Sequence, residues 1–231
     1  MGIPPAFFRR MNYMKTKRLV ISAMLIAVAT VLSLLKLFEL PFGGTVTVAS
    51  MMPVVLIAYL YGTRWGLFCA FVFSIIQLIS GMGTVSAFFL PGDSHMALGS
   101  ALLICFLDYI LAYTVLGFAG IFKGKFKSDI LALCIGTVVA CLLRAIVHII
   151  SGAVFFGAWA EWFFADATGL SQIEALKGFC DWTMRTFTGG GLSVFYSVIY
   201  NMSYMLPETV ITAASAPVVY KILAKSKAVE L

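Results

Sequence analysis

Three polar side chains lie within otherwise apolar stretches of the sequence: Asp108, His148 and Asn201. Ionisable and amide groups are costly inside a bilayer, and they persist there mainly where they face one another or a ligand. With a helical rise of about 1.5 Å per residue, each of them lies roughly 12 to 16 Å from the outer end of its apolar stretch. We therefore expect an acid, an imidazole and an amide to meet at one depth and form a binding site.

Aromatic residues accompany these three groups. Those that we expect at or above the same depth are Tyr109, Phe155, Phe156, Trp159, Tyr196 and Tyr200. Aromatic faces attract cations, and a low dielectric strengthens the attraction between a cation and a buried carboxylate. The pattern favours a flat, cationic organic ligand, with ordinary packing as the alternative role for any one of these rings.

The elements that must position these groups are membrane-spanning helices. Hydrophobic residues make up 61% of the 231 residues and charged residues 11%, whereas a soluble domain carries about a quarter charged residues. Six apolar segments are long enough to span a bilayer or nearly so. They cover residues 19–38, 46–62, 65–82, 97–122, 129–156 and 192–223. The sequence therefore predicts an all-α integral membrane protein with six transmembrane helices.

Charged residues alternate between the connections of these segments. Basic residues gather before the first segment, at Arg64, at 123–127 and after the last segment, whereas the other connections are mainly acidic. Under the positive-inside rule both termini are cytoplasmic. The net charge of +6 thus reflects membrane topology rather than nucleic-acid binding. We expect a multi-pass protein of a bacterial plasma membrane.

The predicted domain organisation is simple. Residues 1–17 form a cytoplasmic leader that we expect to be disordered, and Met14 offers a second possible start. Residues 18–231 form a single six-helix membrane domain. Its longest connection, at about 157–191, is extracellular and rich in aromatic residues. That loop is either an interfacial aromatic belt or a lid over the site.

Two further groups of residues have weaker signals. Arg144 and Glu208 lie deeper than the main site, and we expect them to form a structural ion pair across the fifth and sixth segments. Ala23 and Ala27 form a small-xxx-small surface on the first helix, where another helix could approach closely. Alanine is common in membrane helices, so chance also produces this spacing.

Several kinds of chemistry are missing from the sequence. There is no phosphate-binding Gly-x-x-x-x-Gly-Lys-Ser/Thr motif and no His-Glu-x-x-His metal motif. The cysteines show no metal-ligand spacing. A remote alternative is an intramembrane serine protease with Ser193 as nucleophile and His148 as base, but about 12 Å of helical rise separates their depths. We expect no catalytic residues, no metal and no cofactor.

The sequence resembles a known family of membrane proteins in several stretches. Residues 144–156 and 195–208 are similar to the thiamine-specific S component of energy-coupling factor (ECF) transporters, which is the subunit that binds the substrate. Residues 107–112 and 116–120 match the fourth helix of that family. The resemblance extends over about 17–223.

The resemblance implies a six-helix subunit that captures thiamine. The residues that correspond to its thiamine site are Asp108, Tyr109, His148, Phe156, Tyr196 and Asn201, with Trp159 at the mouth. The small-residue surface of Ala23 and Ala27 would dock the transmembrane coupling subunit, and two ATPase subunits would supply energy. This chain departs from the family pattern in its longer connections, at 157–191 and before the fourth segment.

Alternatives to this function stay open at the level of sequence. The chain could be a self-sufficient carrier of thiamine or another vitamin, coupled to protons through His148 and Asp108. The ligand could also be a phosphorylated form of thiamine or a pyrimidine precursor.

Overall fold

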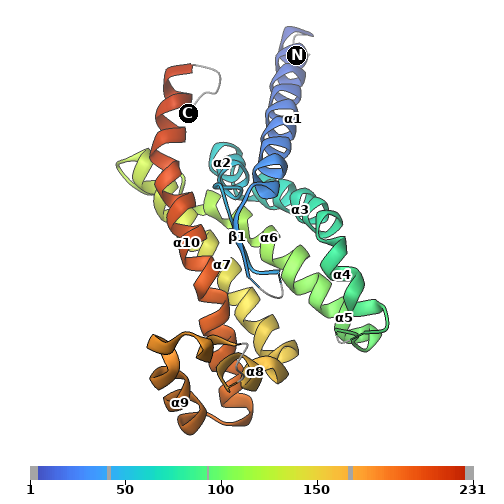
Figure 1. Cartoon of the computed structure of the whole chain (residues 1–231). Coiled ribbons are helices and arrows are strands. Elements are labelled where there is room, and N and C mark those ends of the chain that lie inside the picture. The colour runs from blue at the N-terminus through green and yellow to red at the C-terminus, as the bar shows by residue number, and fades with distance from the viewer. Residues whose placement is uncertain (1–4, 41–42, 93, 166–168, 227–231) are drawn as a thin grey trace.

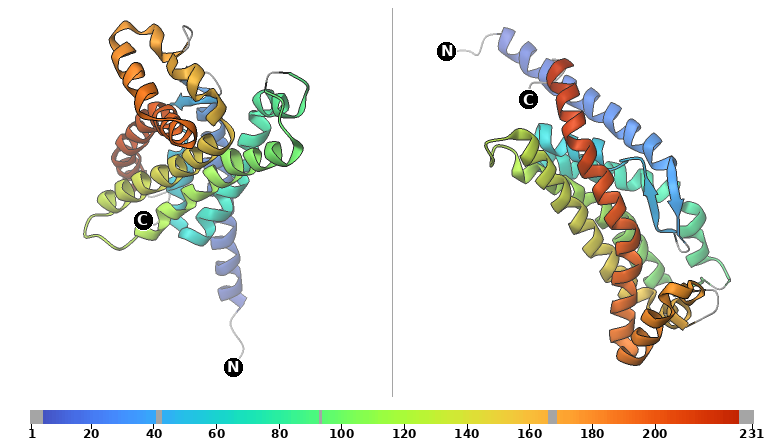
Figure 2. Two further views of the ribbon diagram at one scale, coloured as in Figure 1. Left: turned by 90° about the horizontal axis from the view of Figure 1, so that it is seen from below. Right: turned by 60° about the vertical axis from the view of Figure 1, so that its left-hand side comes forward.

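The fold is an elongated bundle of helices with one small β-hairpin at one side (Figures 1 and 2). This computed structural model describes residues 5–40, 43–92, 94–165 and 169–226. The first half comprises α1 (Pro5–Leu34), β1 (Lys36–Glu39), β2 (Thr45–Thr47), α2 (Met52–Tyr61), α3 (Thr63–Ser80), α4 (Met82–Phe89), α5 (Leu98–Ile104), the π-helix η2 (Cys105–Leu111), α6 (Ala112–Thr114) and the 3-10 helix η3 (Val115–Phe122). The second half comprises α7 (Asp129–Phe155), η4 (Gly157–Trp159), α8 (Ala160–Ala165), η5 (Leu170–Gln172), η6 (Glu174–Leu176), α9 (Lys177–Thr186) and α10 (Gly189–Ser226).

Four helical segments of the described chain are long and apolar enough to cross a membrane: Met14–Leu34, Thr63–Ser80, Leu98–Phe122 and Asp129–Phe155. They agree with four of the predicted apolar segments. α2 is apolar but shorter, because the residues before it form β2 and a turn. α10 is 38 residues long and contains Pro207 and Pro217.

The first helix begins earlier than the sequence predicted. α1 runs from Pro5, so residues 5–17 of the expected disordered leader are helical, and residues 1–4 lie outside the described part of the chain. Proline is tolerated in the first turn of a helix, and neither proline nor glycine interrupts residues 6–34. The helix therefore continues without a break into the first predicted span.

The β-hairpin corrects the prediction of an all-α fold. β1 and β2 pair antiparallel with Phe38 opposite Val46, and β1 is exposed whereas Val46 and Thr47 of β2 are buried. Ala49, which follows β2, has a left-handed backbone with φ of 55°. This conformation is uncommon for a residue other than glycine, and it redirects the chain from the hairpin into α2.

Helices pack most closely at glycine residues, which have no side chain. α7 and α10 lie against each other along much of their length (Figures 1 and 2). A Cβ atom on Gly152 of α7 would overlap the Ser197 hydroxyl of α10, and one on Gly117 of η3 would overlap the backbone of Leu67 in α3. Small residues allow such close approach between membrane helices. The Gly152 contact holds together the two helices that carry His148 and Asn201.

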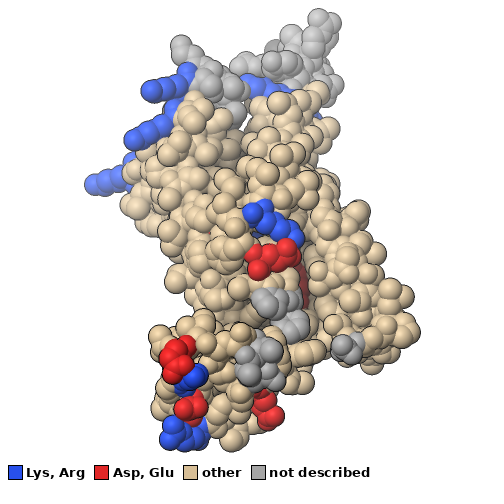
Figure 3. Space-filling view, in the orientation of Figure 1, with Lys and Arg blue, Asp and Glu red and all other residues tan. Residues whose placement is uncertain are grey.

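Both ends of the bundle carry charged residues. The N-terminal end of α1 and the C-terminal end of α10 lie at the same end (Figure 1). Figure 3 shows Lys and Arg side chains near that end, whereas at the middle and at the opposite end, where α8 and α9 are found, acidic residues lie with basic residues beside them. The basic residues before the first predicted segment and after the last therefore lie at one end of the bundle.

Candidate ligand-binding site

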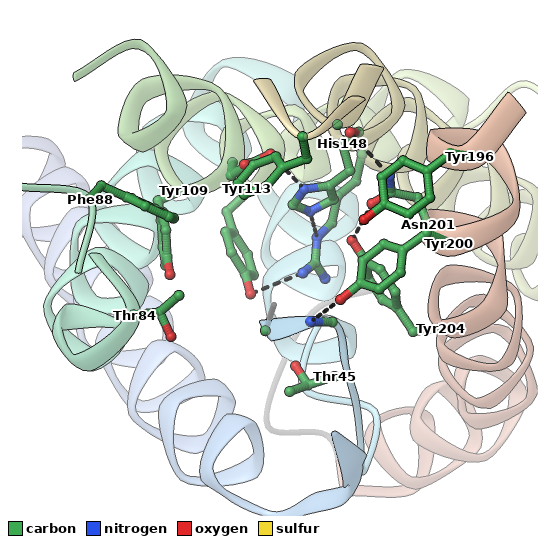
Figure 4. Close-up of a pocket in the computed structure, with 16 residues that line it drawn as sticks. Thr45, Thr84, Phe88, Tyr109, Tyr113, His148, Tyr196, Tyr200, Asn201 and Tyr204 are labelled. Atoms are coloured by element: carbon green, nitrogen blue, oxygen red, sulfur yellow. Dashed lines mark hydrogen bonds and ion pairs between the residues drawn. The ribbon is translucent and has the colours of Figure 1, made fainter. Parts of the chain in front are cut away.

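A cavity lies between the hairpin, α4, η2, α6, α7 and α10 (Figure 4). The volume of this cavity is about 110 Å³. The predicted binding residues that line it are Asp108, Tyr109, His148, Phe156, Tyr196 and Asn201. Arg144 also lines it, although the sequence assigned it only a structural role. The expectation that an acid, an imidazole and an amide meet at one level agrees with this geometry.

The acidic centre of the cavity is Asp108. His148 Nδ1 lies 3.0 Å from Asp108 Oδ1, and the Ser151 hydroxyl donates to Asp108 Oδ2 at 2.9 Å. Asp108 lies on η2, and π-helical turns are frequent at functional sites. Its side chain is 20% exposed, whereas that of His148 is 10% exposed. The carboxylate is thus the more accessible member of the pair.

Arg144 is the cation beneath this pair. Its Nε donates to His148 Nε2 at 3.3 Å, its Nη2 donates to the Tyr113 hydroxyl at 2.9 Å, and its Nη1 donates to the Met51 sulfur at 3.0 Å. The guanidinium carbon also lies 4.1 Å from the centre of the Tyr113 ring. These contacts fix the guanidinium in the wall of the cavity.

The predicted ion pair between Arg144 and Glu208 is wrong in its geometry. No contact within 4.0 Å joins their charged groups among the side chains described here. Glu208 instead accepts hydrogen bonds from the Thr47 backbone N–H and the Thr47 hydroxyl, each at 2.6 Å. The unpredicted strand β2 supplies these donors, and Glu208 therefore anchors the hairpin to α10.

Asn201 joins α10 to α7. Its amide nitrogen donates to Ser197 O at 2.8 Å and to His148 O at 3.3 Å, and its Oδ1 accepts from the Tyr204 hydroxyl at 2.7 Å. Because protein groups already contact both ends of this amide, Asn201 shapes the cavity wall. The Tyr204 ring packs edge-on against His148 with 6.1 Å between ring centres.

Several lining residues were missed by the sequence analysis. They are Gly43, Gly44, Thr45, Thr84, Phe88, Tyr113, Gly152 and Tyr204. Tyr204 follows Tyr196 and Tyr200, which the sequence analysis named, at helical spacing and could have been found from that periodicity. Figure 4 shows these rings on the α10 side, facing Tyr109, Phe88 and Thr84.

The hairpin closes one side of the cavity. The Gly44 backbone N–H donates to the Tyr200 hydroxyl at 3.2 Å. A Cβ atom at this position would lie 2.7 Å from the Tyr204 ring, so only glycine fits between the hairpin and α10. Nothing in the spacing of apolar residues indicates this contact.

A larger outer cavity of about 710 Å³ adjoins the first. Both cavities are lined by Gly43, Thr84, Phe88 and Phe156. The rings of Phe88 and Phe156 pack edge-to-face at 6.0 Å between their centres. Of the two cavities, Trp159 lines only this larger one.

The expected outer loop folds onto the site wall. Phe163 of α8 packs against Tyr196 and Tyr200, with ring centres 5.2 and 6.2 Å apart. Phe187 stacks on Phe195 of α10 at 4.4 Å. The aromatic residues of this loop therefore support the α10 side of the cavity.

The remaining predicted residues lie outside the cavity. Ala23 and Ala27 are exposed on the outer surface of α1. Ser193 donates to Gly189 O and lies against Gly157, so its hydroxyl does not serve His148 as the protease alternative requires. No group of residues in the described ranges could hold a metal ion.

Known membrane transporters are similar to this chain in sequence and in fold. Residues 19–162 match the family of thiamine transporter proteins. The chain is 28% identical over 207 residues to the thiamine transporter ThiT of Bacillus subtilis (strain 168), a match that covers 85% of this chain and 86% of that protein. A solved structure of ThiT from Listeria monocytogenes has the same fold, with a TM-score of 0.57 at 19% identity over 92% of this chain and 96% of the other. The family consists of transporters rather than enzymes. The long apolar helices of this chain make it a multi-pass protein of the cell membrane. The chain belongs to the thiamine transporter family.

Proposed function

We propose that this chain is the substrate-binding subunit of a thiamine uptake transporter, which captures thiamine from outside the cell. The observation that supports this most directly is the accessible carboxylate of Asp108 in a cavity walled by aromatic rings. Sequence similarity to a thiamine transporter along most of the chain supports the choice of ligand.

The chemistry of thiamine matches the lining of the cavity. Thiamine has a permanently cationic thiazolium ring and an aminopyrimidine ring that can donate and accept hydrogen bonds. Asp108 supplies a negative charge, and Tyr109, Tyr196 and Tyr200 supply aromatic faces and hydroxyl groups. A cation between such groups is attracted by both the carboxylate and the rings, and desolvation strengthens each attraction. The proposed binding residues are thus Asp108, Tyr109, His148, Phe156, Tyr196 and Asn201, with Trp159 at the mouth.

The proposed topology has six membrane crossings and cytoplasmic termini. The basic end of the bundle faces the cytoplasm under the positive-inside rule. The loop 157–191 and the outer cavity then face the exterior, and residues 18–231 form one membrane domain. α2 crosses as a short helix that the hairpin extends, and α10 provides the sixth crossing.

The proposed partners are those of energy-coupling factor transporters. Ala23 and Ala27 present a small exposed surface on α1, where a helix of a transmembrane coupling subunit can approach closely. Two ATPase subunits would supply the energy, because this sequence carries no phosphate-binding loop.

Thiamine titration of the purified protein tests the proposed function. Two unit charges 4 Å apart attract by about 4 kcal/mol at an effective dielectric constant near 20. We expect Asp108→Asn to weaken binding at least about 100-fold, which corresponds to about 2.7 kcal/mol. Glu174→Gln is the matched control, since Glu174 is exposed and pairs with Lys177 outside both cavities. Wild-type affinity no better than millimolar would refute the function.

A self-sufficient carrier is the second candidate, because acid–imidazole pairs such as Asp108 and His148 can relay protons. Vesicles that contain this chain alone distinguish the two. Uptake of thiamine driven by a pH gradient without ATP would favour the carrier. Competition with phosphorylated thiamine and with the free aminopyrimidine identifies the preferred ligand.

A further inference from the structure

The protonation state of His148 follows from its two ring partners. An arginine side chain can only donate hydrogen bonds. Because Arg144 Nε donates to His148 Nε2, that ring nitrogen presents its lone pair and carries no proton. The proton of the neutral ring then lies on Nδ1, 3.0 Å from Asp108 Oδ1, and is donated to the carboxylate. Partners on both sides thus select one tautomer.

Burial keeps water from replacing the hydrogen-bond partners of His148. Arg144 is 6% and His148 is 9% exposed, so water does not readily replace either partner. The other donors of Arg144 that have partners contact a phenol and a thioether, both of them neutral. Protonation of His148 on Nε2 would break its bond to Arg144 and place two cations in contact.

Other titratable groups surround His148 and its partners. The titratable and charged groups that face it or its direct partners are Asp108 and Tyr109 from η2, Tyr113 from α6, Tyr200, Tyr204 and Glu208 from α10, and Cys141 and Arg144 from α7 itself. Phenols, thiols and guanidinium groups ordinarily titrate above about pH 8. Asp108 lies within hydrogen-bond distance of His148 Nδ1 and accepts from the Ser151 hydroxyl, and Glu208 accepts from the backbone N–H and the hydroxyl of Thr47. An imidazole is the group that could change charge at neutral pH.

We propose that Arg144 is a positioning residue that holds His148 neutral, with its proton on Nδ1, so that the imidazole adds no positive charge beside the carboxylate of Asp108 that faces the ligand. A protonated His148 would neutralise Asp108 and remove its attraction for a cation. Arg144 thereby makes binding of a cationic ligand insensitive to pH. Of the two tests below, only the affinity measurement rests on the proposed function. The other measures the protonation of the His148 ring in protein without ligand.

The first test reads the ring nitrogens directly. The chain contains two histidines, so ¹⁵N-histidine labelling gives few signals, and His95→Gln identifies those of His148. In ligand-free protein we expect a protonated Nδ1 and an unprotonated Nε2 at both about pH 7.5 and about pH 5.5. A proton on Nε2 at either pH would overturn the proposal, whether or not the protein binds thiamine.

The second test removes the donor and follows thiamine affinity against pH. In Arg144→Met the unbranched side chain ends at the level of the former Nε and cannot donate, so His148 Nε2 is free to accept a proton. We expect its affinity to fall at least about tenfold between about pH 7.5 and about pH 5.5. Wild type and Arg144→Lys, which keeps a cationic donor, should change less than about threefold over the same range.

The two variants separate positioning from structure. A purely structural role of Arg144 would lower the affinity of Arg144→Met equally at both pH values, and this result would overturn the proposal. If Arg144→Met does not fold, the ¹⁵N spectrum of the wild type still tests the proposal, because a proton on Nε2 of His148 would overturn it. If the wild type fails to bind thiamine but shows the expected tautomer, the proposed function fails and the assignment of His148 stands.

Discussion

The contact between α7 and α10 at Gly152 provides a demanding test of the site geometry. In Gly152→Ala the new Cβ would overlap the Ser197 hydroxyl and lie 2.9 Å from Asn201 Nδ2. Overpacking of this kind costs about 1–3 kcal/mol. Two hydrogen bonds cross the same contact, from Ser197 to Ile149 O at 2.7 Å and from Asn201 to His148 O at 3.3 Å. Weakening either adds about 1 kcal/mol.

The expected total is a loss of about 2–4 kcal/mol, which for a chain of this size lowers Tm by about 4–15 °C. Displacement of α10 also moves Asn201 and Tyr204 from His148, so we expect thiamine affinity to fall about tenfold. Thermal unfolding in detergent and thiamine titration measure the two effects. Gly99→Ala is the control, because its Cβ meets no atom within 4 Å.

A double-mutant cycle with Ser197→Ala identifies the cause. Without the Ser197 hydroxyl, the alanine at 152 loses its closest clash, so Gly152→Ala should cost less in that background by more than about 0.5 kcal/mol. Additive effects, or a Gly152→Ala protein as stable as Gly99→Ala, would refute the proposed close contact.

Three other changes test separate parts of the structure. Thr47→Val removes a donor from the buried carboxylate of Glu208, so unfolding should become easier by about 1–3 kcal/mol in thermal denaturation, and an unchanged stability would contradict the hairpin anchor. Tyr204→Phe leaves Asn201 Oδ1 without its 2.7 Å donor and should cost about 1–3 kcal/mol by the same measurement, whereas no loss would mean that this bond is not formed. Ala27→Trp enlarges the exposed face of α1, so co-purification with the coupling subunit should fall while thiamine affinity stays within about twofold, and normal complex formation would exclude this docking surface.

The depth of a side chain in a membrane helix can be read from the sequence, and this explains which parts of the site were predictable. Asp108, His148 and Asn201 each lie a countable number of residues from the end of an apolar stretch. Because helical rise is nearly constant, equal counts give equal depth. Depth alone does not say which faces meet, but polar groups inside a bilayer turn inward. Together the two rules were sufficient to bring these residues to one cavity.

Partners that come from distant backbone could not be predicted in this way. Glu208 binds Thr47, which lies 161 residues away in the chain, on a strand with no apolar periodicity of its own. The sequence offered Arg144 as the natural partner of Glu208 because charge was the only criterion available. In the structure a backbone N–H and a hydroxyl satisfy the carboxylate, and the arginine takes neutral acceptors instead.

A change in helix type also hid one lining residue. In an α-helix, residues three or four apart share a face, so Asp108 and Tyr113 would point apart. η2 is a π-helix, in which the hydrogen bonds join residues five apart. This wider turn helps Tyr113 to line the same cavity as Asp108 and to reach Arg144.

One face of α7 carries three residues with different roles at four-residue intervals. Arg144 determines which ring nitrogen of His148 carries the proton, His148 contacts Asp108, and Gly152 lets α10 approach closely. Each requirement alone is satisfied by many sequences, but on one rigid helix the position of any of them fixes the other two. The arginine can therefore act on the carboxylate of Asp108 without touching it, since the imidazole between them is held by the same helix that carries its donor.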